Sequence, residues 1–328
     1  MGDLSPKLKI VYLMKILNEK TDETHAITMP EIISLLEGYG ISAERKSIYS
    51  DIEQLRLFGM DIIGEQRDRT FYYYVANRNF ELAELKLLVD SVASARFITE
   101  KKSNSLIKKI EALGSNFDAG QLQRQVFVTE RVKSENEQIL YNIDSIHKAI
   151  AENSGITFNY FNWSADKTMK LRHDGKRYEM SPWALTLSDE YYYLVCYDSE
   201  TSSIKYFRVD KMLKIDLTNK QREGKETFEH FDIADYAKKR FRMYDGEERK
   251  VTIVCRNEYA GVIIDRFGKD ISMHPFDEDN FTVTVTVAVS NQFLAWVLAM
   301  PDIMKITGPE DVVSKAKDLI AKVNDIYK

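Results

Sequence analysis

Four basic side chains in the middle of the chain could bind an anion. Arg172, Lys176 and Arg177 lie close together in one polar segment, and Arg208 interrupts an aromatic and β-branched run over residues 204–209. A buried guanidinium without a partner is very costly, so Arg208 must reach solvent or find an anion. Arginine can donate two parallel hydrogen bonds to a phosphate or carboxylate, and nearby tyrosines can donate a hydrogen bond or stack on a base. The sequence therefore predicts an anion site, with an ordinary salt bridge for Arg208 as the alternative.

Strand-like runs around polar turns must position these side chains. In residues 191–197, period-two alternation places Tyr193 and Val195 on one face and Leu194 and Cys196 on the other. Residues 198–202 are rich in turn formers and separate this run from the one that ends near Arg208. Together with the expected strands at residues 156–161 and 170–180, this gives about five strands, enough for a small SH3-like β-barrel.

The same region resembles the WYL domain of bacterial transcriptional regulators, which is named after a Trp-Tyr-Leu strand. The triplet here is Tyr192-Tyr193-Leu194, and residues 181–185 and 207–212 also match the family pattern. The resemblance implies an SH3-like barrel that binds an effector, in several members nucleic acid or a nucleotide-like ligand. The matching positions expected to bind an anionic effector are Tyr160, Arg172, His173, Arg177, Ser181, Tyr193 and Arg208.

The N-terminal quarter predicts three helices followed by a β-hairpin. Thr28 and Glu31 form a capping-box pattern at the start of the second helix, and Ser42 is expected to cap a third helix that runs to about Phe58. The N-terminal part of such a helix enters the major groove, where Arg and Lys contact phosphates and guanine. The hairpin is expected at residues 61–75 with its tip at residues 65–69. The candidate DNA contacts are Ser42, Arg45, Lys46, Ser47, Tyr49, Ser50, Arg67 and Arg69.

This order of elements resembles the winged helix of the deoxyribonucleoside-repressor type that precedes WYL domains, and it implies binding to a double-stranded DNA operator. Where that family often has an Arg-Asp pair, this chain has Ser50-Asp51. Residues 1–77 carry nine Lys and Arg against twelve Asp and Glu, so overall charge does not favour DNA. The alternative is a protein-interaction adaptor with a degenerate winged helix.

Residues 78–137 predict a helical linker. Two amphipathic helices are expected there, with a break near residues 103–105 and a short strand at residues 126–128. Their apolar faces predict either a dimerisation bundle that spaces two winged helices or packing within one chain. We expect a homodimer.

Residues 229–328 predict a βαββαβ order, which is a ferredoxin-like arrangement. Residues 264–268 and the Val-rich run before Asn291 resemble the C-terminal extension that follows WYL domains. The resemblance implies that this part forms a dimer contact or a lid on the partner's barrel.

The whole chain therefore predicts an α+β multidomain protein: a winged helix (1–77), a helical linker (78–137), a WYL domain (138–228) and a ferredoxin-like domain (229–328). The net charge of −5 and pI of about 5.7 exclude DNA binding by bulk charge, so any contact must be local. The sequence has no signal-peptide pattern and no membrane-spanning run. Cys196 and Cys255 lie in apolar runs and are predicted to be core residues. We therefore expect a cytoplasmic protein.

We expect no enzymatic activity, cofactor or metal, because the sequence has no P-loop, nucleophile elbow, paired carboxylates or metal-ligand spacing. The competing enzyme hypothesis is a phosphodiesterase that uses His173 and Asp174 beside the basic cluster.

Overall fold

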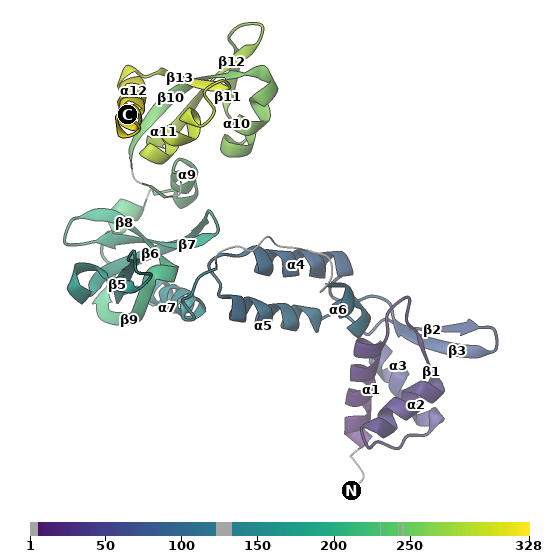
Figure 1. Ribbon diagram of the computed structural model, residues 1–328. Coiled ribbons are helices and arrows are strands. Elements are labelled where there is room, and N and C mark those ends of the chain that lie inside the picture. Colours follow the sequence, from purple (N-terminus) through teal and green to yellow (C-terminus); the bar gives the residue numbers. More distant parts are fainter. Residues whose placement is uncertain (1–5, 123–132, 230, 242, 245) are drawn as a thin grey trace. The chain divides into compact units, whose positions relative to one another are not determined.

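The computed structural model describes residues 6–122 and 133–328, apart from residues 230, 242 and 245 (Figure 1). The chain divides into two compact units, residues 1–137 and residues 138–328. The strand expected at residues 126–128 lies outside the described residues.

The first unit begins with three helices and a small antiparallel sheet. The sheet order is β1-β3-β2, and β2 pairs with β3 from Ile62 opposite Val75 to Arg67 opposite Thr70. Buried Leu13, Ile32, Ile48 and Ile52 share one apolar core. The elements are α1 (Pro6–Lys20), β1 (Ile27–Thr28), α2 (Met29–Gly38), α3 (Arg45–Leu57), β2 (Ile62–Arg67) and β3 (Thr70–Val75).

Capping of the second and third helices differs. The predicted capping box of α2 is confirmed, because the Thr28 N–H donates to the Glu31 carboxylate at 2.6 Å and the Thr28 hydroxyl accepts from the Glu31 N–H at 3.5 Å. The prediction that Ser42 caps α3 is wrong. Glu44 occupies the N-cap position without a side-chain hydrogen bond, and Ser42 lies in the preceding extended segment.

The hairpin tip is also tighter than expected, since β2 continues to Arg67 and leaves only residues 68 and 69 as the turn.

The linker contains α4 (Leu82–Ser94), α5 (Glu100–Glu111) and α6 (Asn116–Leu122). The predicted break at residues 103–105 is wrong, because α5 runs through it. The break lies before Thr99, whose hydroxyl accepts from the Lys102 N–H at 3.2 Å and caps α5. Leu85, Val89 and Leu122 form a small core between these helices.

The second unit begins with α7 (Ile139–Ala151) packed on a six-stranded curled sheet of order β5-β4-β6-β7-β8, with β9 also paired to β4. Phe158 on β4 is fully buried, stacks on Tyr178 and meets Phe207 edge to face. The strands are β4 (Ser154–Trp163), β5 (Met169–Leu171), β6 (Tyr178–Ser188), β7 (Tyr191–Asp198), β8 (Ser203–Arg208) and β9 (Met212–Gln221). The short helices α8 (Lys225–Phe228) and α9 (Ile233–Lys238) follow.

The last third of the chain forms a four-stranded antiparallel sheet of order β11-β12-β10-β13. Its apolar face, which includes Val251, Ile253 and Val285, packs against Ile263, Phe293 and Val312 from the helices. The elements follow in the order β-α-β-β-α-β with one further helix: β10 (Glu247–Arg256), α10 (Ala260–Phe267), β11 (Ser272–Pro275), β12 (Asn280–Val289), α11 (Asn291–Leu298), β13 (Met304–Gly308) and α12 (Glu310–Ile326).

Cys196 and Cys255 are buried and not joined in a disulfide, which confirms that both are core residues. No helix within the described ranges combines the length and the apolar character needed to span a bilayer.

Candidate functional site

Arg208, at the end of β8, is held by a carboxylate two residues further along the chain. A 3₁₀ turn over Val209–Lys211 follows the strand, so that the guanidinium donates to Asp210 through Nε at 3.0 Å and Nη2 at 2.7 Å. The guanidinium also lies 3.5 Å from the centre of the Tyr191 ring. Burial works to lower the pKa of Arg208, but the Asp210 carboxylate outweighs it and raises the pKa. The salt-bridge alternative for Arg208 is therefore the one that the structure contains.

Tyr160 on β4 lies next to this ion pair. Its side chain is buried, its ring meets Tyr178 and Phe207 edge to face, and its hydroxyl accepts a hydrogen bond from the Arg208 N–H at 3.2 Å. Burial raises the pKa of Tyr160 to about 12. The phenol thus stays protonated at neutral pH, and its O–H remains a potential hydrogen-bond donor.

One further cation lies beside Tyr160, and another lies within electrostatic range of Arg172 and Arg208. The guanidinium of Arg172 lies 5.9 Å from the centre of the Tyr160 ring. Burial lowers the pKa of Lys211, and the charges of Arg208 and Arg172 lower it further while Asp210 opposes them. Neither Arg172 nor Lys211 forms an ion pair within the part of the chain that the structure describes. We call the group of Tyr160, Arg172, Arg208, Asp210 and Lys211 the cation cluster.

The cation cluster has three cations against one carboxylate. The ion pair to Asp210 fixes Arg208, whereas the charges of Arg172 and Lys211 are not neutralised by a direct ion pair within the described residues. Phosphate or carboxylate groups satisfy such an excess through charge-assisted hydrogen bonds. The half-buried ring of Tyr193, the cross-strand partner of Arg208, adds a surface on which a base can stack. This arrangement can therefore bind an anionic or nucleotide-like ligand.

Of the other predicted effector residues, Tyr193 and His173 lie near the cluster. Tyr193 is the direct cross-strand partner of Arg208, so both side chains lie on one face of the sheet. Burial raises the pKa of Tyr193, and the charge of Arg208 opposes this. His173 is exposed in a left-handed turn and meets the Tyr178 ring edge to face at 5.6 Å.

Arg177 and Ser181 have structural partners elsewhere. Arg177 donates to the carbonyls of Thr157 at 2.9 Å and Lys214 at 2.6 Å, and it pairs with Asp216 at 2.7 Å. It thereby joins β4 to β9. The buried Ser181 hydroxyl accepts a hydrogen bond from the Glu223 N–H at 2.9 Å. Neither has a contact to Tyr160 or Arg208 among those that the structure gives.

Lys211 is the residue that sequence reasoning missed. It belongs to the run of residues 207–212 that carries the family resemblance, but it is not among the predicted effector positions. A strand pattern continued to Asp210 gives no reason to place Lys211 beside Arg172. The 3₁₀ turn after Arg208 does so, and the signal in the sequence was the close spacing of Arg208, Asp210 and Lys211.

Residues 141–217 match the family model of the WYL domain. The chain contains a WYL domain. The match covers the cation cluster, including Lys211, and the strand β7 with its Tyr192-Tyr193-Leu194 triplet. No curated protein matches the chain.

Two solved structures show a loose similarity to the chain. One is proteasome accessory factor B/C (PafBC) of Arthrobacter aurescens, with a TM-score of 0.29 and 14% identity over 98% of this chain and 48% of that one. The chain thus spans about half the length of PafBC. The other is a CRISPR Cas-related protein, with a TM-score of 0.38 and 13% identity over 75% of this chain and 71% of that one.

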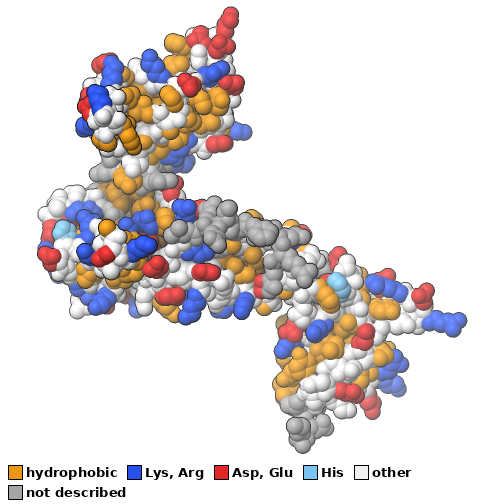
Figure 2. Space-filling view, in the orientation of Figure 1, with side chains coloured by type: hydrophobic (Ala, Val, Ile, Leu, Met, Phe, Trp, Pro, Cys, Tyr) orange, Lys and Arg blue, Asp and Glu red, His pale blue; other side chains and the backbone are white. Residues whose placement is uncertain are grey.

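Apart from Ser42, the predicted DNA contacts lie on α3 and on the β2–β3 hairpin. Arg45, Lys46, Tyr49 and Ser50 are exposed along the first turns of α3. Figure 2 shows Lys and Arg side chains at the tip of the hairpin as well as over the curled sheet. We call Arg45, Lys46 and Arg69 the exposed basic residues, because none of them forms an ion pair among the residues that the structure describes.

The remaining candidates are less free to contact DNA. The Ser47 hydroxyl accepts from Lys9 on α1, and Lys9 also pairs with Asp51 at 2.8 Å. Arg67 pairs with Glu65 at 3.1 Å and lies over the Tyr72 ring. Ser42 is exposed but precedes the helix. The structure therefore divides the candidates into a few unpaired cations and several residues that already have partners.

The phosphodiesterase hypothesis names two residues of the turn before β6. His173 and Asp174 are both exposed, and both have a left-handed backbone with φ of 50° and 52°. Within the described residues, no group of three His, Cys, Asp or Glu side chains is placed to hold a metal ion.

Proposed function

We propose that this protein is a ligand-responsive, DNA-binding transcriptional regulator without enzymatic activity, active in the cytoplasm as a homodimer. In this proposal, α3 and the β2–β3 hairpin act as a winged helix that reads an operator, and the WYL domain binds an anionic or nucleic-acid-like effector. The observation that carries it is the cation cluster inside the WYL match, where Arg172 and Lys211 form no ion pair.

The cation cluster is suited to sensing because part of it is held in place before a ligand arrives. Asp210 and Tyr191 fix the Arg208 guanidinium, and the backbone N–H of Arg208 donates to the Tyr160 hydroxyl. A ligand that meets a fixed donor loses less conformational entropy on binding. Arg172 lies on a turn and Lys211 is half-buried, so a ligand can recruit both charges at once.

The first unit supports DNA binding by its order of elements and by the placement of its cations. The helices α2 and α3 precede a hairpin, and the exposed basic residues lie at the start of α3 and at the hairpin tip. The start of a recognition helix is the part that meets base edges, and the loop of a hairpin can reach phosphates. Effector binding would act on DNA binding as a coupling between two separate sites.

Salt-dependent binding to DNA tests the DNA-reading part. In a mobility-shift assay with DNA that flanks the protein's own gene, we expect binding by the wild type and strong weakening by the double change R45A/K46A. The matched control is K108A/K109A, which removes two charges from the exposed face of α5. Equal DNA binding by R45A/K46A and K108A/K109A would contradict this part of the proposal.

The second candidate function is a protein-interaction adaptor, which the acidic balance of residues 1–77 favours. Glu44 lies at the N-cap of α3, and Glu65 and Asp68 lie at the hairpin beside its arginines. These carboxylates oppose phosphate binding. An adaptor would show no DNA binding at low salt in the same assay, while the effector site would remain intact.

A further inference from the structure

The last helix, α12, changes character halfway along its length. Its first half packs into the core of the C-terminal sheet domain through Val312 and Ala316. From Ile320 onward every residue is exposed. Several of these exposed residues are large and apolar. The exposed fractions are 51% for Ile320, 47% for Val323 and 86% for Tyr327. Helices of this length depend on packing of an apolar face, so a bare apolar stripe indicates a missing partner.

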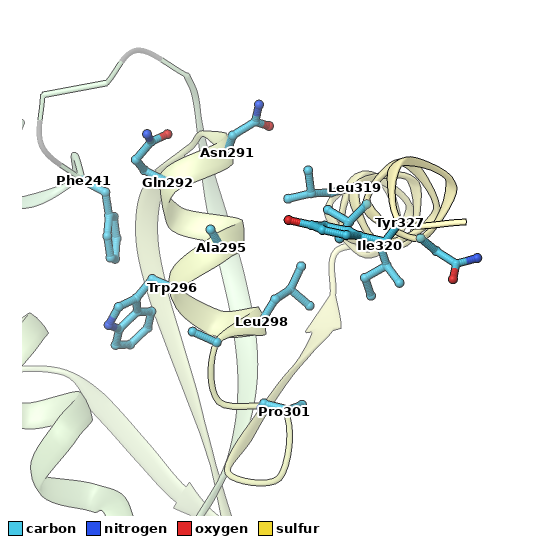
Figure 3. A pocket seen from close by; sticks show the side chains of 13 residues that line it. Phe241, Asn291, Gln292, Ala295, Trp296, Leu298, Pro301, Leu319, Ile320 and Tyr327 are labelled. Carbon is cyan, nitrogen blue, oxygen red and sulfur yellow. The ribbon is translucent and has the colours of Figure 1, made fainter.

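An open groove runs beside this stripe. Figure 3 shows Leu319 and Tyr327 extending from α12 toward Ala295 and Leu298 of α11 across a gap. The groove encloses about 1140 Å³ and is lined mostly by apolar side chains, with Asn291, Gln292 and Asn324 as the polar ones. Alanines on the α11 wall leave room for side chains from outside, as in grooves that accept an amphipathic helix.

The apolar stripe is symmetric about Val323. Leu319 and Ile320 precede Val323 by four and three residues, and Ile326 and Tyr327 follow it by three and four. When two copies of such a helix cross antiparallel at Val323, every apolar residue of one meets an apolar residue of the other. Self-complementarity of this kind is what a two-fold interface requires.

One charged pair follows the same symmetry, while Lys322 and Asp325 fall opposite the uncharged Asn324 and Ala321. Asp318 lies five residues before Val323, and Lys328, just beyond the end of α12, lies five residues after it, so an antiparallel crossing brings Asp318 near Lys328 of the second copy, twice. Lys328 pairs with Asp325 at 2.9 Å within one chain, and both side chains are well exposed, so it can turn to either partner. A second copy of the chain carries the same symmetric pattern and is therefore complementary to the first. A protein of unrelated sequence does not carry it.

We propose that two copies of this chain associate through antiparallel packing of α12 on α12, with the end of each helix seated in the groove beside α11 of the other. The exposed apolar side chains of one α12 amount to roughly 500 Å², near the upper end for a patch on a monomer. Addition of the α11 wall brings the surface toward the ~800 Å² per partner of a stable interface. This deepens the proposed function, since it rests on the homodimer and assigns its contact surface.

Sedimentation equilibrium of the full chain tests the surface. We expect a dimer at micromolar concentration, and we expect V323E to weaken the dimer at least 100-fold. The matched control is A321E, at an exposed position off the stripe, which should change the dissociation constant less than threefold. Far-UV circular dichroism of both variants checks that the exposed substitutions leave the fold intact. Equal effects of V323E and A321E would overturn the proposal.

Cross-linking gives an independent measurement. Both native cysteines are buried, so V323C introduces the reactive thiol at the predicted two-fold axis. Mild oxidation should link V323C chains in pairs and leave A321C chains unlinked. If the wild type is a dimer but V323C does not cross-link and V323E stays dimeric, the α12 surface is wrong and the homodimer stands. If the wild type is monomeric up to 100 μM, both the surface and the homodimer of the proposed function are wrong.

Discussion

The WYL domain and the N-terminal domain both present cations to a prospective anionic partner, but they hold them differently. Arg208 in the WYL domain is partly buried, bonded to Asp210 twice and stacked on Tyr191. Arg45 and Lys46 on α3 are exposed and unpaired within the described residues. A fixed cation selects the shape of a small ligand, whereas mobile surface cations suit a phosphate backbone that offers many equivalent contacts. Sequence alone shows only that both regions contain arginine.

The largest expected effect comes from removing the carboxylate that holds Arg208 in the WYL domain. Asp210→Ala should lower the free energy of unfolding by about 2–3 kcal/mol, because Arg208 would remain partly buried without its carboxylate. Urea titration followed by tryptophan fluorescence measures it. The matched control is Asp216→Ala, whose carboxylate pairs with Arg177 at 2.7 Å but is mostly exposed, so its loss should cost under ~1 kcal/mol. Similar costs for the two variants would show that Arg208 is not held as described.

The next largest effect concerns the exposed cations of α3. R45A/K46A should reduce the slope of log affinity against log salt by about two, since each neutralised phosphate contributes a slope of roughly 0.9. Affinity at 0.1 M salt should fall by about tenfold or more. The K108A/K109A control should leave the slope unchanged. A fall in affinity without a change in slope would mean that these residues support the fold of α3 and not phosphate contacts.

A smaller effect comes from the buried phenol of Tyr160. Its pKa is raised by burial to about 12. Because the unfolded chain ionises first, near pH 10, the contribution of Tyr160 to stability is complete below pH 10 and is lost as the pH rises toward 12. Between pH 9 and pH 11 the wild type should therefore lose about 1 kcal/mol more stability than Tyr160→Phe. Parallel losses in both proteins, measured by urea titration at the two pH values, would place Tyr160 in a more solvated site.

The smallest effect separates the two arginines of the hairpin. Arg69 forms no ion pair among the described residues, while Arg67 is paired with Glu65 at 3.1 Å. R69A should reduce the salt slope of DNA binding by about one, and R67A by less, because the charge of Arg67 is already partly neutralised. Fluorescence anisotropy over a series of salt concentrations resolves the difference. A larger change for R67A would show that DNA displaces Glu65 from its arginine.

Local patterns predicted most of the elements. The Thr28 and Glu31 capping box and the alternation in β7 depend only on neighbouring residues, and both are found in the structure. Ser42 and the serines at residues 103–105 misled for a single reason. Each is a residue type that favours a helix start or a loop, but α3 begins only after Glu44 and α5 continues through residues 103–105.

The site was harder to predict than the elements because it depends on pairing between distant strands. Arg177 and Arg172 look equivalent in the sequence, five residues apart in one basic segment. The pairing of β4 with β9 draws Arg177 to the carbonyl of Lys214, while Arg172 stays beside Tyr160. The pairing of β4 with β9 is not encoded in the spacing of Arg172 and Arg177.

The most direct measurement of the proposed sensing site is an anisotropy titration with a fluorescein-labelled six-nucleotide single-stranded thymidylate. The full-length wild type, R172A/K211A, the matched surface control K148A and the α3 variant R45A/K46A are compared at one salt concentration. The cation cluster predicts that R172A/K211A loses at least tenfold in affinity while K148A and R45A/K46A stay within threefold of the wild type. Binding that is unchanged in R172A/K211A, or absent from the wild type, would contradict a nucleic-acid-like effector at the cation cluster.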